Sequence, residues 1–553
     1  MTAAPASDEL LFVALGGAGE IGMNLNLYGH DGSWLMVDLG VTFGDETTPG
    51  IELIMPNPRF IVERRERLAG LVLTHAHEDH IGAVPHIWPH LRCPIYATPF
   101  TAALLRRKLH EAGLAAEAPI TEVPMSGQFR VGPFEIELVT LTHSIPEPNA
   151  LVLRTAAGTV LHTGDWKLDP EPLVGPTADM DALRRLGTEG VLALVCDSTN
   201  ALVEGASGSE AEVREQLTRI IGRFEQRVAV ACFASNVARL ESVVHAALAH
   251  DRHVALVGRS LWRIVEAARE TGYMTGLPPF ISEHDAGYLP RDKVVLICTG
   301  SQGEPRSALA RIAREDHPQV QLDRGDAVVF SSRIIPGNEK AIGRLQNDLA
   351  RLGVEIVTER DAFVHVSGHP ARDELQRMYQ AVRPRVAIPV HGERRHLEAH
   401  ARLAEECQVP VALVVENGQM VRLAPGPAEI AGEVESGRLG LDGTMLAPLD
   451  GTALKHRHRM SHSGSAVATL VIDGDGELVA LPQVTLHGLI DPEQDAELLR
   501  VTAAAVRAAV EDLPRARRGD DDAVTEAARL AVRRTLHTLR GKKPMTDVHL
   551  VRV

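Results

Sequence analysis

Short apolar segments separated by turn residues dominate the first 200 residues of the chain. Apolar or β-branched runs with such boundaries are typical of strands. The segment His30-Asp31-Gly32-Ser33 lies between two of them and predicts a tight hairpin turn. Because a helical pattern at 101–113 falls between strands, the sequence favours an α/β or α+β fold. The predicted strands are 11–15, 24–28, 34–37, 71–74, 135–142, 159–163 and 191–196.

The pattern changes near Gly208, where amphipathic helices begin to alternate with short apolar strands. This alternation predicts an α/β unit built on a parallel sheet. Its predicted helices are 211–224, 236–249 and 259–271, and its predicted strands are 227–231, 254–257, 294–298 and 327–331. Two further strands, 385–390 and 411–415, are expected after it.

The last part of the chain predicts a small separate domain. A Pro- and Gly-rich stretch at 424–432 and a polar run at 455–464 indicate a linker. Beyond them, a strand, two helices and a second strand suit an α+β domain. These elements are expected at 467–472, 493–510, 523–540 and 547–551.

Length and composition narrow the class of protein. A chain of 553 residues is too long for one core, so several domains are expected. No apolar run approaches the ~20 residues of a membrane span, and the N-terminal sequence lacks the pattern of a signal peptide. The five cysteines are scattered, with no Cys-x-x-Cys pair, which argues against disulfides and a thiolate zinc site. We therefore expect a cytoplasmic protein with no membrane partner.

The formal charge of −16 counts against a nucleic-acid binder, because phosphate neutralisation supplies most non-specific affinity. A local positive groove can nevertheless lie on an acidic body. Aromatic residues make up only 4% of the chain, which favours gripping of a backbone over stacking on bases. Basic clusters occur at 106–108, 394–395, 455–459 and 533–534 with 542–543. Composition alone leaves the substrate undecided.

The most informative segment is Leu71-Val-Leu-Thr-His75-Ala-His77-Glu-Asp79-His80. In an extended loop His75 and His77 project to the same side, because side chains alternate with a period of two. Asp79 and His80 then begin the next element and can point at a second centre. Imidazole nitrogen and carboxylate oxygen together suit zinc or manganese. A solvated, His-rich turn is the alternative, which the H-x-H-x-D-H spacing after a buried strand disfavours.

Three further candidate ligands follow predicted strands elsewhere in the chain. His143 follows 139–142, Asp165 follows 160–164, and His391 follows 386–390. Each alone would be an ordinary polar residue at a strand end. Together they make a convergent set of metal ligands plausible.

Two other motifs have simpler explanations. Gly17-Ala-Gly19-Glu-Ile-Gly22 matches the dinucleotide fingerprint G-x-G-x-x-G, but the residues after it alternate like a strand instead of opening a helix. We expect a loop that lines the metal site. In His396-Leu-Glu-Ala-His400 the glutamate is one place too late for a zincin helix, so an exposed helix face is expected.

The motifs together resemble the metallo-β-lactamase superfamily, more narrowly its β-CASP nucleic-acid-processing branch, and within that the bacterial ribonuclease J family. Asp38 matches the first motif, the 75–80 segment the second, His143 the third and Asp165 the fourth. Further matching stretches are Gly16–Asn24, 143–147, 162–167, 196–200, 233–236, 299–304, 331–339, 365–369 and 389–393. The resemblance spans Gly16 to Glu393.

The resemblance implies an α/β fold: an αββα metallo-β-lactamase sandwich, an inserted β-CASP α/β domain and a small C-terminal α+β domain. The sandwich would comprise 1–207 and 364–430, the inserted domain 208–363, a linker 431–464 and the C-terminal domain 465–553.

The resemblance also implies the role of each site residue. His75, His77 and His143 would hold one divalent ion, Asp79, His80 and His391 the other, and Asp165 would bridge them, with Asp38 orienting ligands from behind. Zinc is the first choice of metal and manganese the second. His369 would act as proton donor or oxyanion stabiliser, Asp197 would orient it, and Asp79 would share in catalysis. Ser331, His365, Ser367 and Gly368 would grip a substrate phosphate.

The implied function is a two-metal ribonuclease, acting as a 5′-to-3′ exonuclease, an endonuclease or both in RNA maturation and decay. Its partners would be 5′-monophosphorylated single-stranded RNA and further copies of itself in a homodimer or homotetramer. Three alternatives stay open: a small-molecule hydrolase, a DNA-specific nuclease and a non-catalytic RNA-binding scaffold. The inserted region and the complete set of ligands count against the first and the last.

Overall fold

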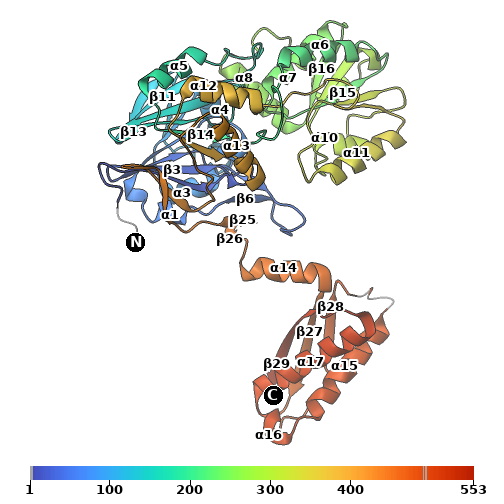
Figure 1. The fold of residues 1–553 in the computed structure, drawn as a ribbon. Helices are drawn as coiled ribbons and strands as arrows, with labels where there is room; N and C mark the ends of the chain where they lie inside the picture. The colour runs from blue at the N-terminus through green and yellow to red at the C-terminus, as the bar shows by residue number, and fades with distance from the viewer. Residues whose placement is uncertain (1–3, 490, 492–494) are drawn as a thin grey trace. The chain divides into compact units, whose positions relative to one another are not determined.

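The computed structural model describes residues 4–489, 491 and 495–553. The start of the first predicted domain, at residues 1–3, and the start of the helix predicted from 493 lie outside them. The chain forms two compact units (Figure 1). The first comprises Met1–Thr42 and Met55–Gly437, and the second comprises Phe43–Ile54 and Arg438–Val553.

Two sheets face each other in the first unit, and their inward apolar side chains form one core, with Phe12 and Val37 from one sheet and Leu151 and Ile388 from the other. The first sheet has the order β24 (Glu429–Glu433), β23 (Gln419–Ala424), β1 (Leu10–Gly16), β3 (Leu25–His30), β4 (Ser33–Val37), β7 (Leu68–Val72), β8 (Ile95–Ala97) and β9 (Ile120–Glu122). The second has the order β10 (Gln128–Val131), β11 (Phe134–Thr140), β12 (Asn149–Thr155), β13 (Gly158–His162), β14 (Ala193–Asp197), β20 (Val386–Val390) and β22 (Val411–Ala412).

Helices cover the outer faces of both sheets. On the first sheet, α1 (Arg59–Val62) packs Phe60 against Trp34 of β4, with ring centroids 5.3 Å apart. A second apolar core, which includes Leu183, Leu375 and Leu403, joins helices to the second sheet. These helices are α5 (Met180–Glu189), α12 (Arg372–Val382) and α13 (Arg394–Glu406). The αββα sandwich expected from the resemblance is confirmed.

Strand direction places the predicted ligands at one edge of the sandwich. β4 runs parallel to β7, and β13, β14 and β20 run parallel to one another. β11 has the same direction as β13, because β12 is antiparallel to both. The carboxyl ends of parallel strands meet at one edge of a sheet. Residues that follow these strands therefore converge.

The inserted part of the first unit is a parallel sheet with helices packed on it, as its sequence pattern predicts. The strand order is β16 (His253–Val257), β17 (Val294–Cys298), β15 (Val228–Ala231), β18 (Ala327–Phe330) and β19 (Glu355–Val357). Its main helices are α6 (Glu210–Ile221), α7 (Val237–Leu248), α8 (Arg259–Glu270), α10 (Ala308–Ala313) and α11 (Glu339–Arg351). Its core includes Leu296, Phe330 and Leu349.

The second unit has its own apolar core under a three-stranded sheet, with Leu470, Val506 and Val532 fully buried. The sheet order is β28 (Gln483–His487), β27 (Ser465–Ile472) and β29 (Met545–Arg552), and the packed helices are α15 (Ala496–Glu511), α16 (Arg515–Arg518) and α17 (Asp521–Arg540). A small sheet joins residues 43–54 to this unit. Its strand order is β26 (Met445–Pro448), β25 (Arg438–Asp442), β6 (Leu53–Pro56) and β5 (Thr42–Phe43).

The segment for which the sequence predicts a linker is structured. β23 and β24 form a hairpin on the first sheet, and 438–463 contain β25, β26 and helix α14 (Thr452–Ser463). The sequence does not predict helix α14 because its residues are mostly polar and only Leu454 is buried. In the part of the chain that the structure describes, no helix has the length and apolar character needed to cross a bilayer.

Candidate metal centre

The ligand loop begins where β7 ends. His75 and His77 lie in the extended segment after this strand, and Asp79 and His80 lie in the short helix α2 (Glu78–Ile81), as the spacing predicts. His75 and His80 are buried, whereas the Asp79 side chain is 28% exposed. One side of the centre is therefore open to solvent.

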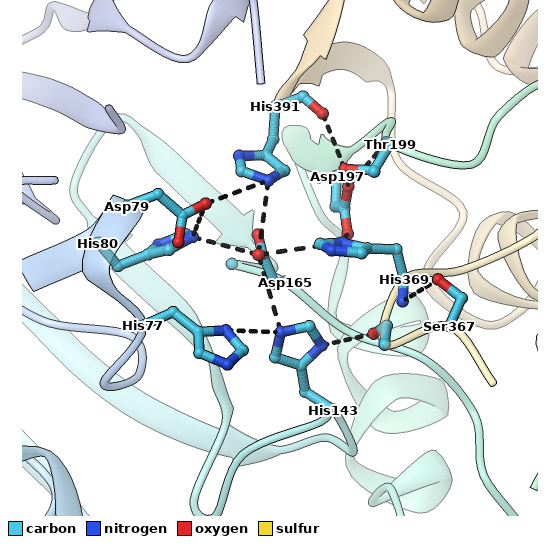
Figure 2. Close-up of polar contacts among 12 residues, drawn as sticks. His77, Asp79, His80, His143, Asp165, Asp197, Thr199, Ser367, His369 and His391 are labelled. Atoms are coloured by element: carbon cyan, nitrogen blue, oxygen red, sulfur yellow. Dashed lines mark hydrogen bonds and ion pairs between the residues drawn. The ribbon is translucent and has the colours of Figure 1, made fainter. Parts of the chain in front are cut away.

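Asp165 lies at the middle of the cluster, after β13. Its Oδ2 atom is 3.2 Å from His80 Nε2 and 3.5 Å from His391 Nε2. The same oxygen is 3.8 Å from the Nε2 atoms of His75 and His143. Figure 2 shows Asp165 between His80, His143 and His391. One carboxylate oxygen thus faces imidazoles from both halves of the cluster.

Asp165 belongs to three overlapping groups of candidate ligands. His75, His77, His143 and Asp165 form the first, and Asp79, His80, Asp165 and His391 form the second. The third consists of Asp165, Asp197, His369 and His391, and within each group the ligand atoms lie within 4.8 Å of one another. The His77 Nδ1 atom is 3.1 Å from His75 Nε2 and 3.0 Å from His143 Nε2. Zinc bound at its usual distances holds neighbouring ligand atoms about 3.4 Å apart. The spacing fits a metal ion.

The electrostatics of the cluster also fit cations. Burial lowers the pKa of His75 and His143 well below the ordinary value and that of His77 to about 4. These imidazoles are neutral near pH 7, with lone pairs free for a metal. Burial opposes ionisation of Asp165, but His391 and His80 outweigh it and hold its pKa well below the usual range. The buried Oδ1 atom of Asp165 has no hydrogen-bond partner among the described residues.

The second nitrogen of each buried imidazole is held by a neighbour. His80 Nδ1 lies 2.7 Å from Asp38 Oδ2, and Asp38 also accepts hydrogen bonds from the backbone N and Oγ1 of Thr74. Thr74 Oγ1 in turn lies 3.0 Å from His75 Nδ1. Such partners fix the orientation of metal-binding histidines. Asp38 contacts the ring nitrogen of His80 that does not face Asp165.

Two further positioning contacts come from residues whose roles the sequence does not reveal. Asn24 Oδ1 lies 3.0 Å from His391 Nδ1, and the Gly368 carbonyl accepts from His143 Nδ1 at 2.5 Å. A Cβ atom on Gly368 would lie 2.6 Å from the His143 ring, so only glycine allows this approach. Asn24 ends the motif Gly16–Asn24, but nothing in the residues around it predicts a contact with a histidine 367 positions away.

His369 and Asp197 form a pair beside the first two groups. His369 Nδ1 lies 2.8 Å from Asp197 Oδ2 and 3.9 Å from Asp165 Oδ2. The other oxygen of Asp197 accepts from the backbone N and Oγ1 of Thr199. Burial disfavours a charged His369, but Asp197 and Asp165 outweigh it and raise its pKa to about 9. A protonated imidazole therefore faces the candidate metal site at neutral pH.

The four residues expected to grip a phosphate have different environments. Ser331 is buried, and its hydroxyl donates to the Val364 carbonyl at 2.7 Å, so its proton is already used. His365 Nδ1 is buried without a hydrogen-bond partner among the described residues. Ser367 Oγ accepts from Asn200 Nδ2 at 2.7 Å and keeps its own proton available. Gly368 contributes its carbonyl to His143, as described above.

Arg239 connects Glu210, Ser331 and Val364 through hydrogen bonds. Its place in an amphipathic helix does not predict these contacts. The guanidinium is fully buried, pairs with Glu210 at 3.0 Å, and donates to the carbonyl and hydroxyl oxygens of Ser331 and to the Val364 carbonyl. Burial, followed by Arg239 and Arg333, lowers the pKa of His365 well below its usual value. His365 is therefore a neutral imidazole beside several cations.

Two predictions about neighbouring motifs have different outcomes. The segment after Gly22 is strand β3, as expected, and β2 (Ala18–Gly19) pairs with β21 (Gly392–Glu393) beside His391. The expectation of an exposed face at His396 and His400 is wrong. Both are buried, because this face of α13 packs on β20, and His400 contacts Ser198 Oγ and the Tyr379 hydroxyl at 2.8 Å each.

Four family models match successive parts of the chain. The models are "Beta-lactamase superfamily domain" at residues 46–183, "Ribonuclease J, beta-CASP domain" at 225–349, "Zn-dependent metallo-hydrolase RNA specificity domain" at 353–414 and "Ribonuclease J C-terminal domain" at 452–553. The first three match parts of the sandwich and its insertion, and the last covers α14 and the domain after it.

Curated relatives match along almost the whole chain. A protein named ribonuclease J from Sinorhizobium meliloti is 48% identical over 99% of this chain and 98% of its own length. Ribonuclease J of Mycolicibacterium smegmatis is 40% identical over 98% of this chain and 97% of its own length. Ribonuclease J2 of Bacillus subtilis is 31% identical over 98% of each chain. A crystal structure of an Enterococcus faecalis protein of unknown function shares the fold at 14% identity, with a TM-score of 0.53 over 75% of this chain and all of that one. With identity of this extent across every domain, the chain belongs to the ribonuclease J family.

Proposed function

We propose that this chain is a ribonuclease that hydrolyses RNA phosphodiester bonds with two divalent metal ions. The observation that carries the proposal is the convergence of seven side chains on one edge of the sandwich, in two groups that share Asp165. The name ribonuclease J, shared by its full-length relatives, supports RNA as the substrate.

The proposed ligands follow from the first two groups. His75, His77 and His143 hold one ion, Asp79, His80 and His391 hold the other, and Asp165 contacts both. Three imidazoles against one shared carboxylate favour zinc for the first position, and manganese is the alternative for both. Asp38 orients His80 from behind.

The two ions, when bound, would generate a nucleophile from water near neutral pH and screen the negative charge that develops on the phosphate. His369 supplies the proton for the departing oxygen. Its Nδ1 atom is held by Asp197, so the Nε2 atom, which has no hydrogen-bond partner among the described residues, faces the substrate side. An oriented general acid of this kind contributes about 10²- to 10⁴-fold to the rate.

Substrate binding is assigned to the segment 365–368, which directly follows the inserted domain. Ser367 and His365 offer polar atoms without full hydrogen-bonding partners, and Gly368 keeps the loop close to His143. Ser331 acts indirectly, since its hydroxyl is committed to Val364 and Arg239. We propose that these residues bind the phosphate of a 5′-monophosphorylated single strand and support 5′-to-3′ degradation, internal cleavage or both.

The cellular setting proposed is RNA maturation and decay in the cytoplasm. The free cysteines, of which Cys93, Cys196, Cys232 and Cys298 are buried, are consistent with a reducing compartment. A homodimer or homotetramer is proposed from the family resemblance.

The test is a time course on end-labelled RNA with the wild type beside Asp79→Ala/His80→Ala. The wild type should degrade 5′-monophosphorylated RNA faster than 5′-triphosphorylated RNA, and the double variant should be inactive. His284→Ala/Asp285→Ala removes an exposed adjacent pair of the same residue types and should behave as wild type. Activity in the double variant would refute the site. Equal cleavage of DNA or of a simple phosphodiester would favour a DNA nuclease or small-molecule hydrolase instead.

A further inference from the structure

Helix α14 of the second unit (Figure 1) has a composition that packing does not explain. Its sequence is TALKHRHRMSHS, and Leu454 is its only buried side chain among these twelve residues. A helix that is polar on all sides needs a role other than covering a core. Here nearly every side chain faces solvent.

The charge on this helix has one sign. The sequence contains no acidic residue between Asp450 and Asp473, whereas α14 carries three Lys or Arg and three His residues. Lys455, His458, Arg459 and His462 have the spacing i, i+3, i+4, i+7 of one helix face, and all four are exposed. At 1.5 Å per residue this basic stripe extends for about 10 Å.

The cations of the basic stripe are not neutralised within the second unit. Neither Lys455 nor Arg459 forms an ion pair with a described residue, whereas Arg457, on another face, pairs with Asp442 at 2.6 Å. On α15, Arg500 and Arg507 pair with Glu497 and Glu511. Lys542, also exposed, adds a cation at the end of the stripe, where its Nζ donates to the His462 carbonyl at 2.6 Å.

We propose that the basic stripe binds the phosphate backbone of single-stranded RNA, an inference that rests on the proposed ribonuclease function. Unpaired Lys and Arg on a chain of net charge −16 form a local positive surface on an acidic body. Backbone phosphates need cations and hydrogen-bond donors, without an apolar anchor. The stripe offers these groups and no others.

Other partners fit this surface less well. A helix that lies on a membrane buries an apolar face, but Met460 is the one large apolar side chain that is exposed on α14. A docked protein is held by large buried anchors, and Met460 is also the one exposed side chain of α14 large and apolar enough to serve as such an anchor. Contact with RNA requires neither feature.

The test compares RNA affinity in the full-length chain with and without Lys455→Gln/Arg459→Gln. All proteins also carry His369→Ala, so that the labelled oligouridine stays intact during an anisotropy titration over a range of salt concentrations. Each lost phosphate contact on a single strand makes the slope of log affinity against log salt shallower by about 0.7. The slope for the double variant should therefore be shallower than that for the parent by about 1.4. If the two proteins bind equally at 1 M salt, the double variant should bind up to about 25-fold more weakly at 0.1 M salt.

The matched control is Arg500→Gln/Arg507→Gln, which removes the same charge from exposed but paired residues of the same unit. It should bind as the parent does, and Lys455→Arg/Arg459→Lys should retain binding. An unchanged slope in the stripe variant, or an equal loss in the control, would overturn the proposal. So would stripe-dependent binding to phosphatidylserine vesicles without binding to RNA. RNA cleavage by the wild type is scored separately, so failure of the ribonuclease function is distinguished from failure of the stripe.

Discussion

The two units of the chain treat polar side chains in opposite ways. The first buries imidazoles, carboxylates and the Arg239 guanidinium, and almost all have partners at 2.5–3.8 Å. In the second, Thr502 is the only buried polar side chain among the described residues. Burying polar groups is costly unless each is paired. The first unit therefore has the features of a preorganised reaction site, and the second has a core that is apolar except for Thr502, with its charges on the surface.

This difference distinguishes the buried candidate ligands of the first unit from the exposed charges of the second. The buried cluster depends on six strands that end at one edge of the sandwich, and small displacements there alter ligand spacing. The surface charges of the second unit contribute little to its stability, because exposed ion pairs contribute about 0–1 kcal/mol. Substitutions in the two units should therefore affect different measurements.

The largest effect is expected from Asp165→Ala. Its Oδ2 atom faces imidazoles of both ligand groups, so its loss should release metal and lower turnover by about 10³-fold or more. Metal analysis of the purified variant, alongside an RNA cleavage assay, checks this. Full metal content with near wild-type turnover would show that Asp165 is not shared between the two groups.

His369→Gln should leave metal content intact but lower kcat by about 10²- to 10⁴-fold. The raised pKa of about 9 means that the imidazolium is present below that pH and lost above it. Bound divalent cations oppose this rise. The wild-type rate should therefore fall with increasing pH at or below about 9, and the variant should lack this limb. A pH profile of kcat that is the same in both proteins would argue against proton donation by His369.

Arg239→Met should destabilise the first unit by about 3–5 kcal/mol, because it leaves Glu210 buried without its partner. Arg239→Met/Glu210→Leu removes both charges and should recover much of that loss. Denaturant unfolding measures both variants. If the double variant is no more stable than the single one, the buried pair is not the cause.

Leu536→Ala tests the second unit, where this side chain is fully buried. Removing it should cost about 2–5 kcal/mol in the unfolding of that unit. Metal content and turnover on a short RNA should stay as in the wild type. A loss of metal in this variant would contradict the separation of the two units.

The convergence of the candidate ligands could be predicted from the sequence because these residues follow strands with clear apolar patterns. Val294–Cys298 has the bounds expected for it, and the strands before Asp38, His75, Asp165 and His391 lie close to their predicted positions. Strand direction then brings their ends together. The local pattern is enough because each ligand is within a few residues of its strand.

Long-range partnerships are the part that the sequence does not reveal. Residues 43–54 belong to the second unit although nearly 400 residues separate them from Arg438. Helix α14 has no apolar pattern from which it could be predicted, because Leu454 is its only buried residue. Arg239 and His400 look like exposed helix positions, yet both are buried by partners far along the chain. Hydrophobic periodicity cannot predict a polar residue whose burial depends on such partners.

Metal stoichiometry of the purified full-length chain tests the central claim most directly. Elemental analysis should find two divalent ions per chain, and chelation should abolish RNA cleavage until zinc or manganese is restored. Full cleavage activity in excess chelator, with no ion retained, would contradict the account.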